Sequence, residues 1–199
     1  MGAIVGSFRF LIEKSFHLIQ AAYVRGRSEW FWLVALLFFY ACIVFINARL
    51  VATEKDIKGS GIPQVEAELK GLMSLSWWSI LWKKFLIGIL AISSGLMLGR
   101  EGPSIQLGAM SGKGISKWLN LSPVEERALI ASGAAAGLAA AFNAPIAGLL
   151  FVVEEVYHHF SRFFWVSTLA ASLVANFISL SIFGLTPVLD MPDNIPLMT

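Results

Sequence analysis

Residues 59–63 read GSGIP and combine a serine with two glycines and a proline. Glycines permit tight turns and let a ligand approach the backbone closely, and proline is favoured at the first position of a helix. The free N–H groups and partial positive charge of a helix N-terminus attract anions. With the Ser60 hydroxyl as an additional donor, the segment could bind a small anion without a full positive charge. A loop followed by an ordinary capped helix also fits these residues.

Residues 99–103 read GREGP and repeat the pattern of glycine followed by proline, here with an acidic residue at the expected helix start. Glu101 lies between the apolar runs 87–98 and 105–110, and an ionisable residue inside a membrane is costly and usually functional. Its carboxylate could occupy an anion site at the helix N-terminus and leave that site on protonation, as a gate that also carries a proton. The alternatives are a surface pair between Arg100 and Glu101 or a simple N-terminal charge.

Glu154 and Glu155 follow thirteen residues without a charge, residues 141–153. Adjacent residues on a helix point about 100° apart, so one carboxylate could face the protein interior while the other faces water. A buried carboxylate that titrates near neutral pH could relay protons. Two acids that reach headgroup water from a helix end fit the pattern as well, and we expect His158 and His159 to be interfacial and passive.

The elements that must position these residues are helices of unequal length, separated by glycine, proline or polar residues. Residues 30–50 form the clearest membrane span, because about 20 apolar residues cross a bilayer. Ser122 and Pro123 predict a helix cap and first turn, and Lys83 and Lys84 are expected to mark a membrane interface. The other expected helices cover residues 5–23, residues 63–72, an apolar run ending at 98, a small-residue helix interrupted at 143–145, and a last span over 163–183.

The composition fits a bilayer solvent better than water. The 199-residue chain is 57% hydrophobic and 14% charged, with a mean hydropathy of +0.72, whereas soluble domains are roughly 45–50% apolar and about 25% charged. Broken helices at membrane depth are tolerated where they pack in protein or line a watery cavity, and secondary transporters use them to build a midplane site. We therefore expect an all-α, multi-span membrane protein with tilted and broken helices.

Several classes of function are disfavoured by the same sequence. The net charge of +2 is too small to indicate a nucleic-acid partner, and the single cysteine, Cys42, allows no disulfide framework. The chain has no HExxH or GxSxG motif of a hydrolase. We expect no enzyme activity, no metal site and no cofactor. The small residues around Gly133 and Gly137 instead favour close helix–helix packing.

Three segments, in this order and at this spacing, resemble the signature segments of the ClC family of chloride channels and transporters. They read GSGIPQ from residue 59, GREGPSIQLGAMSG from residue 99 and GAAAGLAAAFNAPIAGLLFVVEE from residue 133. The resemblance covers nearly the whole chain, and each segment is more specific than a lone GxGxxG. It implies one half of an inverted-repeat fold, in a homodimer whose subunits each carry an ion pathway across the lipid bilayer.

The resemblance also implies roles for particular residues. Ser60 matches the serine that binds chloride with nearby backbone amides, Glu101 matches the gating glutamate, and Glu155 matches the internal proton-transfer glutamate, with Glu154 as its helper. The implied chloride contacts are Gly59, Ser60, Gly61, Ile62, Arg100, Glu101 and Gly102. The acid at position 155 favours chloride–proton antiport, and Ser60 favours chloride over fluoride.

The family's membrane domain extends well beyond the length of this chain. We therefore expect residues 1–199 to be a single membrane domain, the N-terminal half of a ClC-type transport domain cut at both ends, with the missing C-terminal half as a possible partner. The leading hypothesis is antiport of chloride and protons in a bacterial inner or plasma membrane. A passive chloride channel and a non-transporting half that needs a second half are the alternatives.

Overall fold

The computed structural model describes residues 1–199 except residues 27–29, 97, 158–161 and 185–199. The described part is helical and contains no strand, which confirms the all-α fold class. In chain order the elements are α1 (Gly2–Gly26), α2 (Trp30–Thr53), the short 3₁₀ helix η1 (Lys55–Ile57), α3 (Ile62–Leu69), α4 (Trp77–Ser93), α5 (Glu101–Trp118), α6 (Pro123–Phe142), α7 (Pro145–Phe151), the π-helical segment η2 (Val152–Tyr157) and α8 (Arg162–Phe183).

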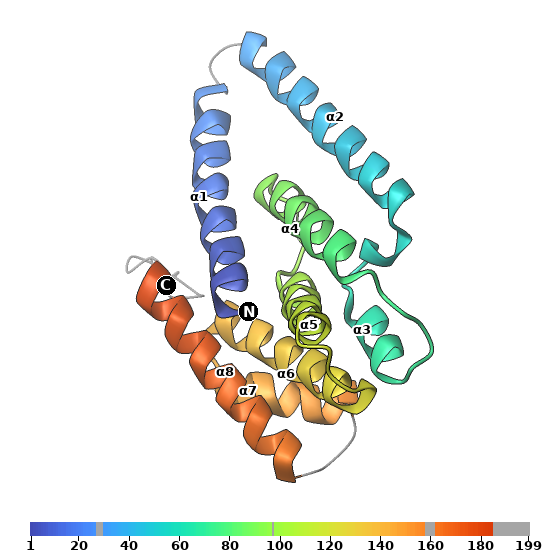
Figure 1. The fold of residues 1–199 in the computed structure, drawn as a ribbon. Helices are drawn as coiled ribbons and strands as arrows, with labels where there is room; N and C mark the ends of the chain where they lie inside the picture. Colours follow the sequence, from blue (N-terminus) through green and yellow to red (C-terminus); the bar gives the residue numbers. More distant parts are fainter. Residues whose placement is uncertain (27–29, 97, 158–161, 185–199) are drawn as a thin grey trace, which may run out of the picture.

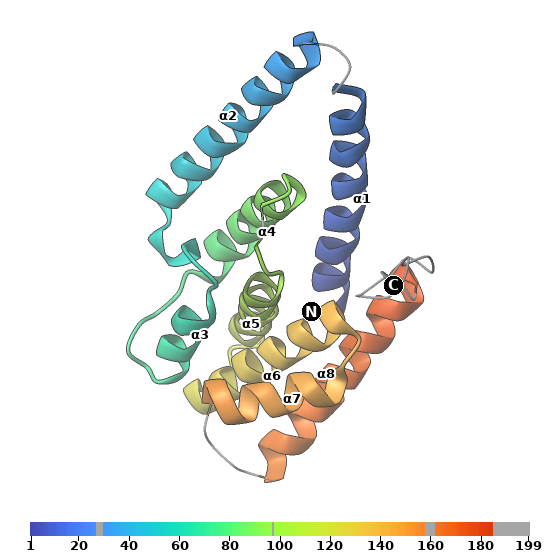
Figure 2. The same ribbon diagram turned by 180° about the vertical axis from the view of Figure 1, so that it is seen from behind.

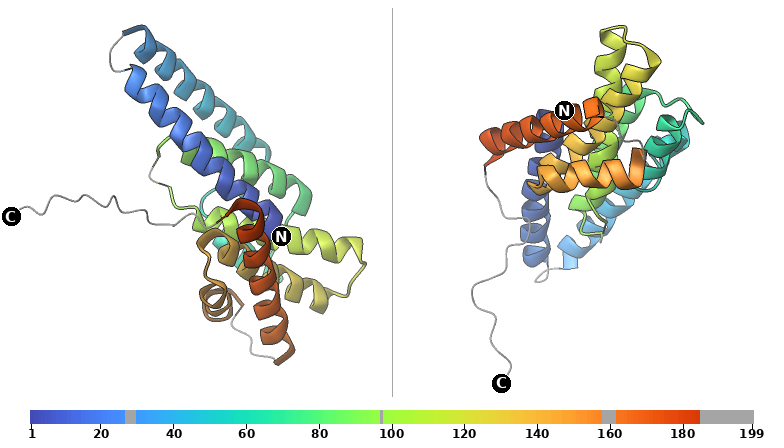
Figure 3. Two further views of the ribbon diagram at one scale, coloured as in Figure 1. Left: turned by 90° about the vertical axis from the view of Figure 1, so that its left-hand side faces the viewer. Right: turned by 90° about the horizontal axis from the view of Figure 1, so that it is seen from below.

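Helix α5 lies at the centre of the molecule, between α4, α3 and α6 (Figure 1). Helix α7 runs beside α6 on the face seen from behind (Figure 2), and α8 packs against α6 and α1. Helices α1 and α2 extend from this group as two long arms, with α4 between them, and the side view in Figure 3 shows the arms next to each other. Helix α5 therefore contacts helices on several sides, while much of α2 is exposed.

Helices α5 and α6 meet backbone to backbone, because glycines face each other across their contact. A methyl group added to Gly108 would lie 2.1 Å from the Gly133 carbonyl oxygen, and one added to Gly137 would lie 2.2 Å from that of Ser104. Small residues allow such an approach in a membrane, where packing contributes most of the attraction between helices. The close packing expected around Gly133 and Gly137 is confirmed.

Two of the described helices are long and apolar enough to cross a bilayer, namely α2 and residues Phe164–Phe183 of α8. They agree with the spans predicted over residues 30–50 and 163–183. Large apolar side chains cover the outside of α2, where Phe31, Leu37 and Phe38 are each at least 70% exposed. Contiguous apolar surface of this kind suits lipid or another protein segment rather than water.

The break between α6 and α7 forms at the residues that predict it. Ser122 and Glu125 form a reciprocal capping box at the start of α6. Asn143 ends the helix with a left-handed φ of 55°, and Pro145 lies in the first turn of α7. The chain then changes from α-helix to the π-helical segment η2, which the sequence pattern did not predict.

Candidate functional site

The GSGIP loop and the start of α5 line a common cavity of about 510 Å³. Ser60 comes from the loop and Glu101 from the first position of α5, and both side chains are exposed. Apolar residues of α4, including Ile87 and Ala91, form another wall of the cavity. The structure thus brings together a serine and a glutamate that the sequence singled out in separate segments.

Ser60 packs directly against the first turn of α5. A methyl group added to Gly102 would lie 2.5 Å from the Ser60 carbonyl oxygen and 2.7 Å from its Cβ, so only glycine fits there. The Ser60 Oγ accepts a hydrogen bond from the Ile62 N–H at 3.4 Å, which leaves the hydroxyl hydrogen free to donate. Gly61 has a φ of 93°, a left-handed conformation that glycine adopts easily. Helix α3 begins directly after it.

Glu101 is the first residue of α5 and lines the cavity. The first N–H groups of a helix lack intrahelical acceptors, and in α5 the Ser104 N–H donates to the Arg100 carbonyl at 3.1 Å. The amides of Glu101 and Gly102 precede it. The Arg100 side chain donates to Glu13 at 3.3 Å from Nη1 to Oε1. Among the described residues, Arg100 therefore pairs with α1 rather than with its neighbour Glu101.

A polar cluster ties the start of α5 to α1 and to the break after α6. The Glu13 Oε1 atom also accepts from Arg9 Nε at 3.0 Å, and Arg9 Nη1 donates to Asn143 Oδ1 at 3.0 Å. Arg9 is only 3% exposed. The Arg100 guanidinium lies over the Phe142 ring, 5.5 Å from its centroid. These contacts fix the turn before Glu101 relative to α6 and α7.

Lys84 of α4 lines the cavity and is buried in the protein. It is 2% exposed, and its Nζ donates to the carbonyl oxygens of Ile57 at 2.9 Å and Gly59 at 2.7 Å. The structure thus separates two lysines that the sequence placed together, since Lys84 is buried while Lys83 pairs with Glu54 at 3.8 Å, and their position at a membrane interface stays a prediction. Adjacent helical residues point about 100° apart, so two consecutive lysines need not both face inward. The sequence alone does not tell which of the two is buried.

Glu154 and Glu155 lie in η2, and neither lines the cavity. Both are exposed, whereas Val153 and Val156 beside them are 0% and 1% exposed. The expectation that one carboxylate faces the interior is not met within the described chain. Single π-helical turns inside helices occur frequently at functional sites, and the relay role of these acids stays a prediction. His158 and His159 lie outside the described residues.

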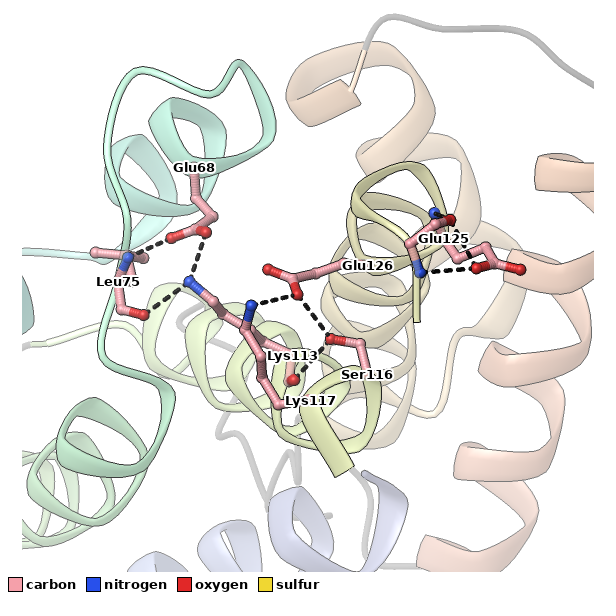
Figure 4. Close-up of polar contacts among 8 residues, drawn as sticks. Glu68, Leu75, Lys113, Ser116, Lys117, Glu125 and Glu126 are labelled. Carbon is pink, nitrogen blue, oxygen red and sulfur yellow. Dashed lines mark hydrogen bonds and ion pairs between the residues drawn. The ribbon is translucent and has the colours of Figure 1, made fainter. Parts of the chain in front are cut away.

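A buried ion pair that we did not single out from the sequence lies further along α5 (Figure 4). The Lys113 Nζ atom is 2.6 Å from Glu68 Oε1 and donates to the Leu75 carbonyl at 2.8 Å. Lys117 extends the polar group to Glu126 of α6, at 2.8 Å. The pair holds the connection between α3 and α4 against α5. A lysine in an otherwise uncharged helical stretch is the signal that could have revealed it.

The sequence matches the voltage gated chloride channel family over residues 35–199. The H(+)/Cl(-) exchange transporter ClcA of Vibrio parahaemolyticus is 37% identical over 208 aligned residues, which cover 97% of this chain and 44% of the relative. The ClcA protein of Vibrio vulnificus is 35% identical over 211 residues, covering 98% and 45%. The chain therefore spans less than half the length of these relatives.

The same fold occurs in a solved structure. The crystal structure of a slow cyanobacterial Cl⁻/H⁺ antiporter superposes with a TM-score of 0.85 and 30% identity, over 98% of this chain and 48% of the antiporter. This coverage agrees with the expectation of a half-length segment of a larger helical domain. The family match extends over most of the chain and includes both segments that line the cavity. The chain therefore belongs to the voltage gated chloride channel family.

Proposed function

We propose that the chain forms part of a transporter that moves chloride across a membrane in exchange for protons. The observation that carries the proposal is the one cavity lined by Ser60, Glu101 and Gly102. Helix N-termini and a hydroxyl offer an anion several N–H and O–H donors. Such donors bind chloride weakly enough to release it again. The relatives named as exchange transporters support antiport as the mode of transport.

Glu101 acts as the gate in this mechanism. A helix N-terminus stabilises a negative charge by roughly 0.3–1 kcal/mol at exposed sites and by up to about 2 kcal/mol in partly buried ones. The ionised Glu101 carboxylate and chloride therefore compete for the same amides of α5. Protonation removes the charge, the side chain leaves the amides, and chloride takes its place. Arg100 supplies a backbone amide here while its side chain remains with Glu13.

Glu155, assisted by Glu154, relays the protons in this proposal. Both carboxylates are exposed on η2, so water can deliver protons to them. They lie on a different segment from Ser60 and outside the cavity lining. Proton and chloride would accordingly enter by separate routes and share only Glu101.

The proposed setting is a bacterial inner or plasma membrane, with the protein as a homodimer. Because the chain spans less than half the length of the curated relatives that it matches, we propose that a second half supplies the other wall of each chloride pathway. The transported ligands are chloride and protons, and no cofactor takes part.

Chloride efflux from liposomes between about pH 4 and 8, a range that spans ordinary carboxylate titration, tests the gate. Wild-type flux should rise as the pH falls, because protonation opens the site. Glu101→Gln cannot ionise, so its flux should be constant with pH and should no longer drive protons. Glu125→Gln is the matched control, because Glu125 also lies in the first turn of a helix but away from the cavity.

Each alternative has its own signature in this assay. A Glu101→Gln variant that retains the wild-type pH response would remove Glu101 from the gate. Chloride flux that never moves protons uphill would indicate a passive channel. Flux that is absent from this chain and restored by a co-expressed second half would identify a half that does not transport alone.

A further inference from the structure

Four consecutive carbonyl oxygens, those of residues 56–59, each accept a hydrogen bond from a side chain outside that segment. Gln106 Nε2 donates to the first at 2.9 Å, and Gln64 Nε2 donates to the third at 3.0 Å. Lys84 Nζ donates to the second and the fourth, at 2.9 and 2.7 Å. We call residues 56–59 the carbonyl segment. It leads directly into Ser60.

Holding these carbonyl oxygens also fixes the N–H groups that follow them. A peptide unit is planar and trans, so its N–H points away from its C=O. The Gly59 carbonyl and the Ser60 N–H belong to the same unit. Lys84, by binding the Gly59 oxygen, therefore sets the direction of the Ser60 N–H. A rotated unit would instead present a carbonyl oxygen to the cavity, and that oxygen would repel an anion.

The side chains of Lys84 and Gln106 are buried, so they have little freedom to adopt other conformations or bind other partners. Lys84 is 2% exposed and Gln106 is 0% exposed. The amide of Gln106 lies against the backbone of Gly61, because a methyl group there would be 2.4 Å from Gln106 Oε1. Gln106 also lies on α5, one turn beyond Gly102, which touches Ser60. The loop is thereby attached to the same helix that carries Glu101.

We propose that Lys84, Gln64 and Gln106 are positioning residues that set the chloride affinity by holding the carbonyl segment, and so the amides that follow it, in one orientation. The proposal deepens and rests on the proposed function, since it assigns the chloride site to donors that do not themselves touch the ion. The Lys84 ammonium group donates hydrogen bonds to two carbonyl oxygens. Lys84 therefore offers the cavity no free ammonium group, and its effect on the anion acts through the amides that it orients.

Chloride titration by calorimetry of the purified protein tests the effect on affinity. Gln106→Met removes one donor without a change of charge. It should weaken chloride binding about fivefold, because the loss of one hydrogen bond changes a binding constant by about this factor. Lys84→Met removes two donors and should weaken it at least tenfold. Lys84→Arg keeps the donors and should recover most of the affinity. Lys83→Met is the matched control, because Lys83 is the adjacent lysine and pairs with Glu54 instead.

Backbone amide resonances of ¹⁵N-labelled protein without chloride test the orientation itself. The Ser60 and Gly61 signals should shift in Lys84→Met and in Gln106→Met, return in Lys84→Arg, and stay unchanged in Lys83→Met. Unchanged Ser60 and Gly61 signals in Lys84→Met and Gln106→Met would overturn the proposal, as would wild-type chloride affinity in these variants. A wild type that binds no chloride would instead overturn the proposed function, while the amide signals would still decide whether the donors orient the loop.

Discussion

Ser60 and Glu101 place two different chemistries in one cavity. The Ser60 hydroxyl can donate to an anion at any pH, whereas the Glu101 carboxylate competes with the anion only when ionised. Among the described residues neither side chain has an ion pair, since Arg100 beside Glu101 binds Glu13 on α1. The proposed proton-linked anion site needs both groups in the same cavity.

Replacing Ser60 with alanine should weaken chloride binding about fivefold, because one hydroxyl donor is lost. The fold should survive, since the Ser60 side chain is exposed to the cavity. Chloride titration by calorimetry measures the effect. Ser7→Ala is the control, because the Ser7 hydroxyl only donates to the Ala3 carbonyl within α1. Equal affinity in wild type and Ser60→Ala would remove Ser60 from the site.

Replacing Glu155 with glutamine should reduce the ratio of protons to chloride ions transported to background while chloride flux continues. The amide has nearly the same size but cannot release a proton, so only the relay is lost. Simultaneous chloride and proton flux measurements in liposomes record the ratio. Persistent wild-type proton transport would move the relay to Glu154 or His158, and a Glu154→Gln variant measured in parallel separates these two.

Two residues that share the cavity could be singled out from the sequence, but the residues that hold the loop before Ser60 in place could not. Ser60 and Glu101 were found because glycine and proline around them predict a helix N-terminus, which is a local property. Lys84 and Gln106 act through contacts across the fold, with the carbonyl oxygens of residues 56–59. No local pattern encodes such contacts.

At the scale of elements, the helix starts at Ser122 and Pro145 agree with the prediction, because these residue types favour the start of a helix. Ser122 caps α6 and Pro145 lies in the first turn of α7, as predicted. The π-helical segment η2 was not predictable, because the apolar and acidic residues there are equally compatible with an α-helix. Within η2, Val152 and Val153 are both buried.

The cap of α6 yields a stability prediction. Replacing Ser122 with alanine removes an N-cap whose Oγ accepts from the Glu125 N–H at 3.4 Å, and should destabilise the protein by about 1 kcal/mol at neutral pH. Thermal unfolding in detergent measures the loss. Ser76→Ala is the matched control, because Ser76 caps α4 without a side-chain hydrogen bond. Equal losses in the two variants would contradict the assigned role of the cap.

The same cap should make stability depend on pH. Hydrogen bonds from the Ser122 hydroxyl and then from its backbone N–H hold the pKa of the Glu125 carboxyl below its usual range. A carboxyl whose pKa is depressed by folding stabilises the protein above its unfolded pKa of about 4.3, and this contribution is lost as the pH falls through the folded value. The difference in the free energy of unfolding between wild type and Ser122→Ala should therefore become smaller as the pH is lowered.

At the scale of the whole molecule, the described chain is organised around α5, and its core depends on small residues. Ala131, Ala134 and Ala135 of α6 are completely buried in this core. The sequence indicated the small-residue helix but not its partner, because the facing glycines lie in two separate segments. The large apolar surface of α2 remains uncovered within the described chain, as expected for a half-length segment in a membrane.

Replacing Gly133 with alanine should destabilise the whole molecule by about 1–3 kcal/mol, because the core has no space for a methyl group. The new Cβ would lie 2.3 Å from the Gly108 carbonyl oxygen. Gly99→Ala adds the same methyl group where no atom lies within 4 Å, so it should leave stability nearly unchanged. Thermal unfolding of both variants in detergent provides the comparison. Wild-type stability in Gly133→Ala would show that the two helices can separate without loss.

The backbone contact between α5 and α6 also limits how a working cycle can proceed. With Gly108 against Gly133 and Gly137 against Ser104, no side chain lies between the helices at these points that could rotate and let one slide past the other. We therefore expect the pair to act as a stator, the stationary part of a machine, in the proposed transport cycle. In the proposed mechanism the moving part is then the Glu101 side chain at the start of α5, which turns about its rotatable bonds. A machine built in this way changes state by the torsion of one carboxylate rather than by the displacement of a helix.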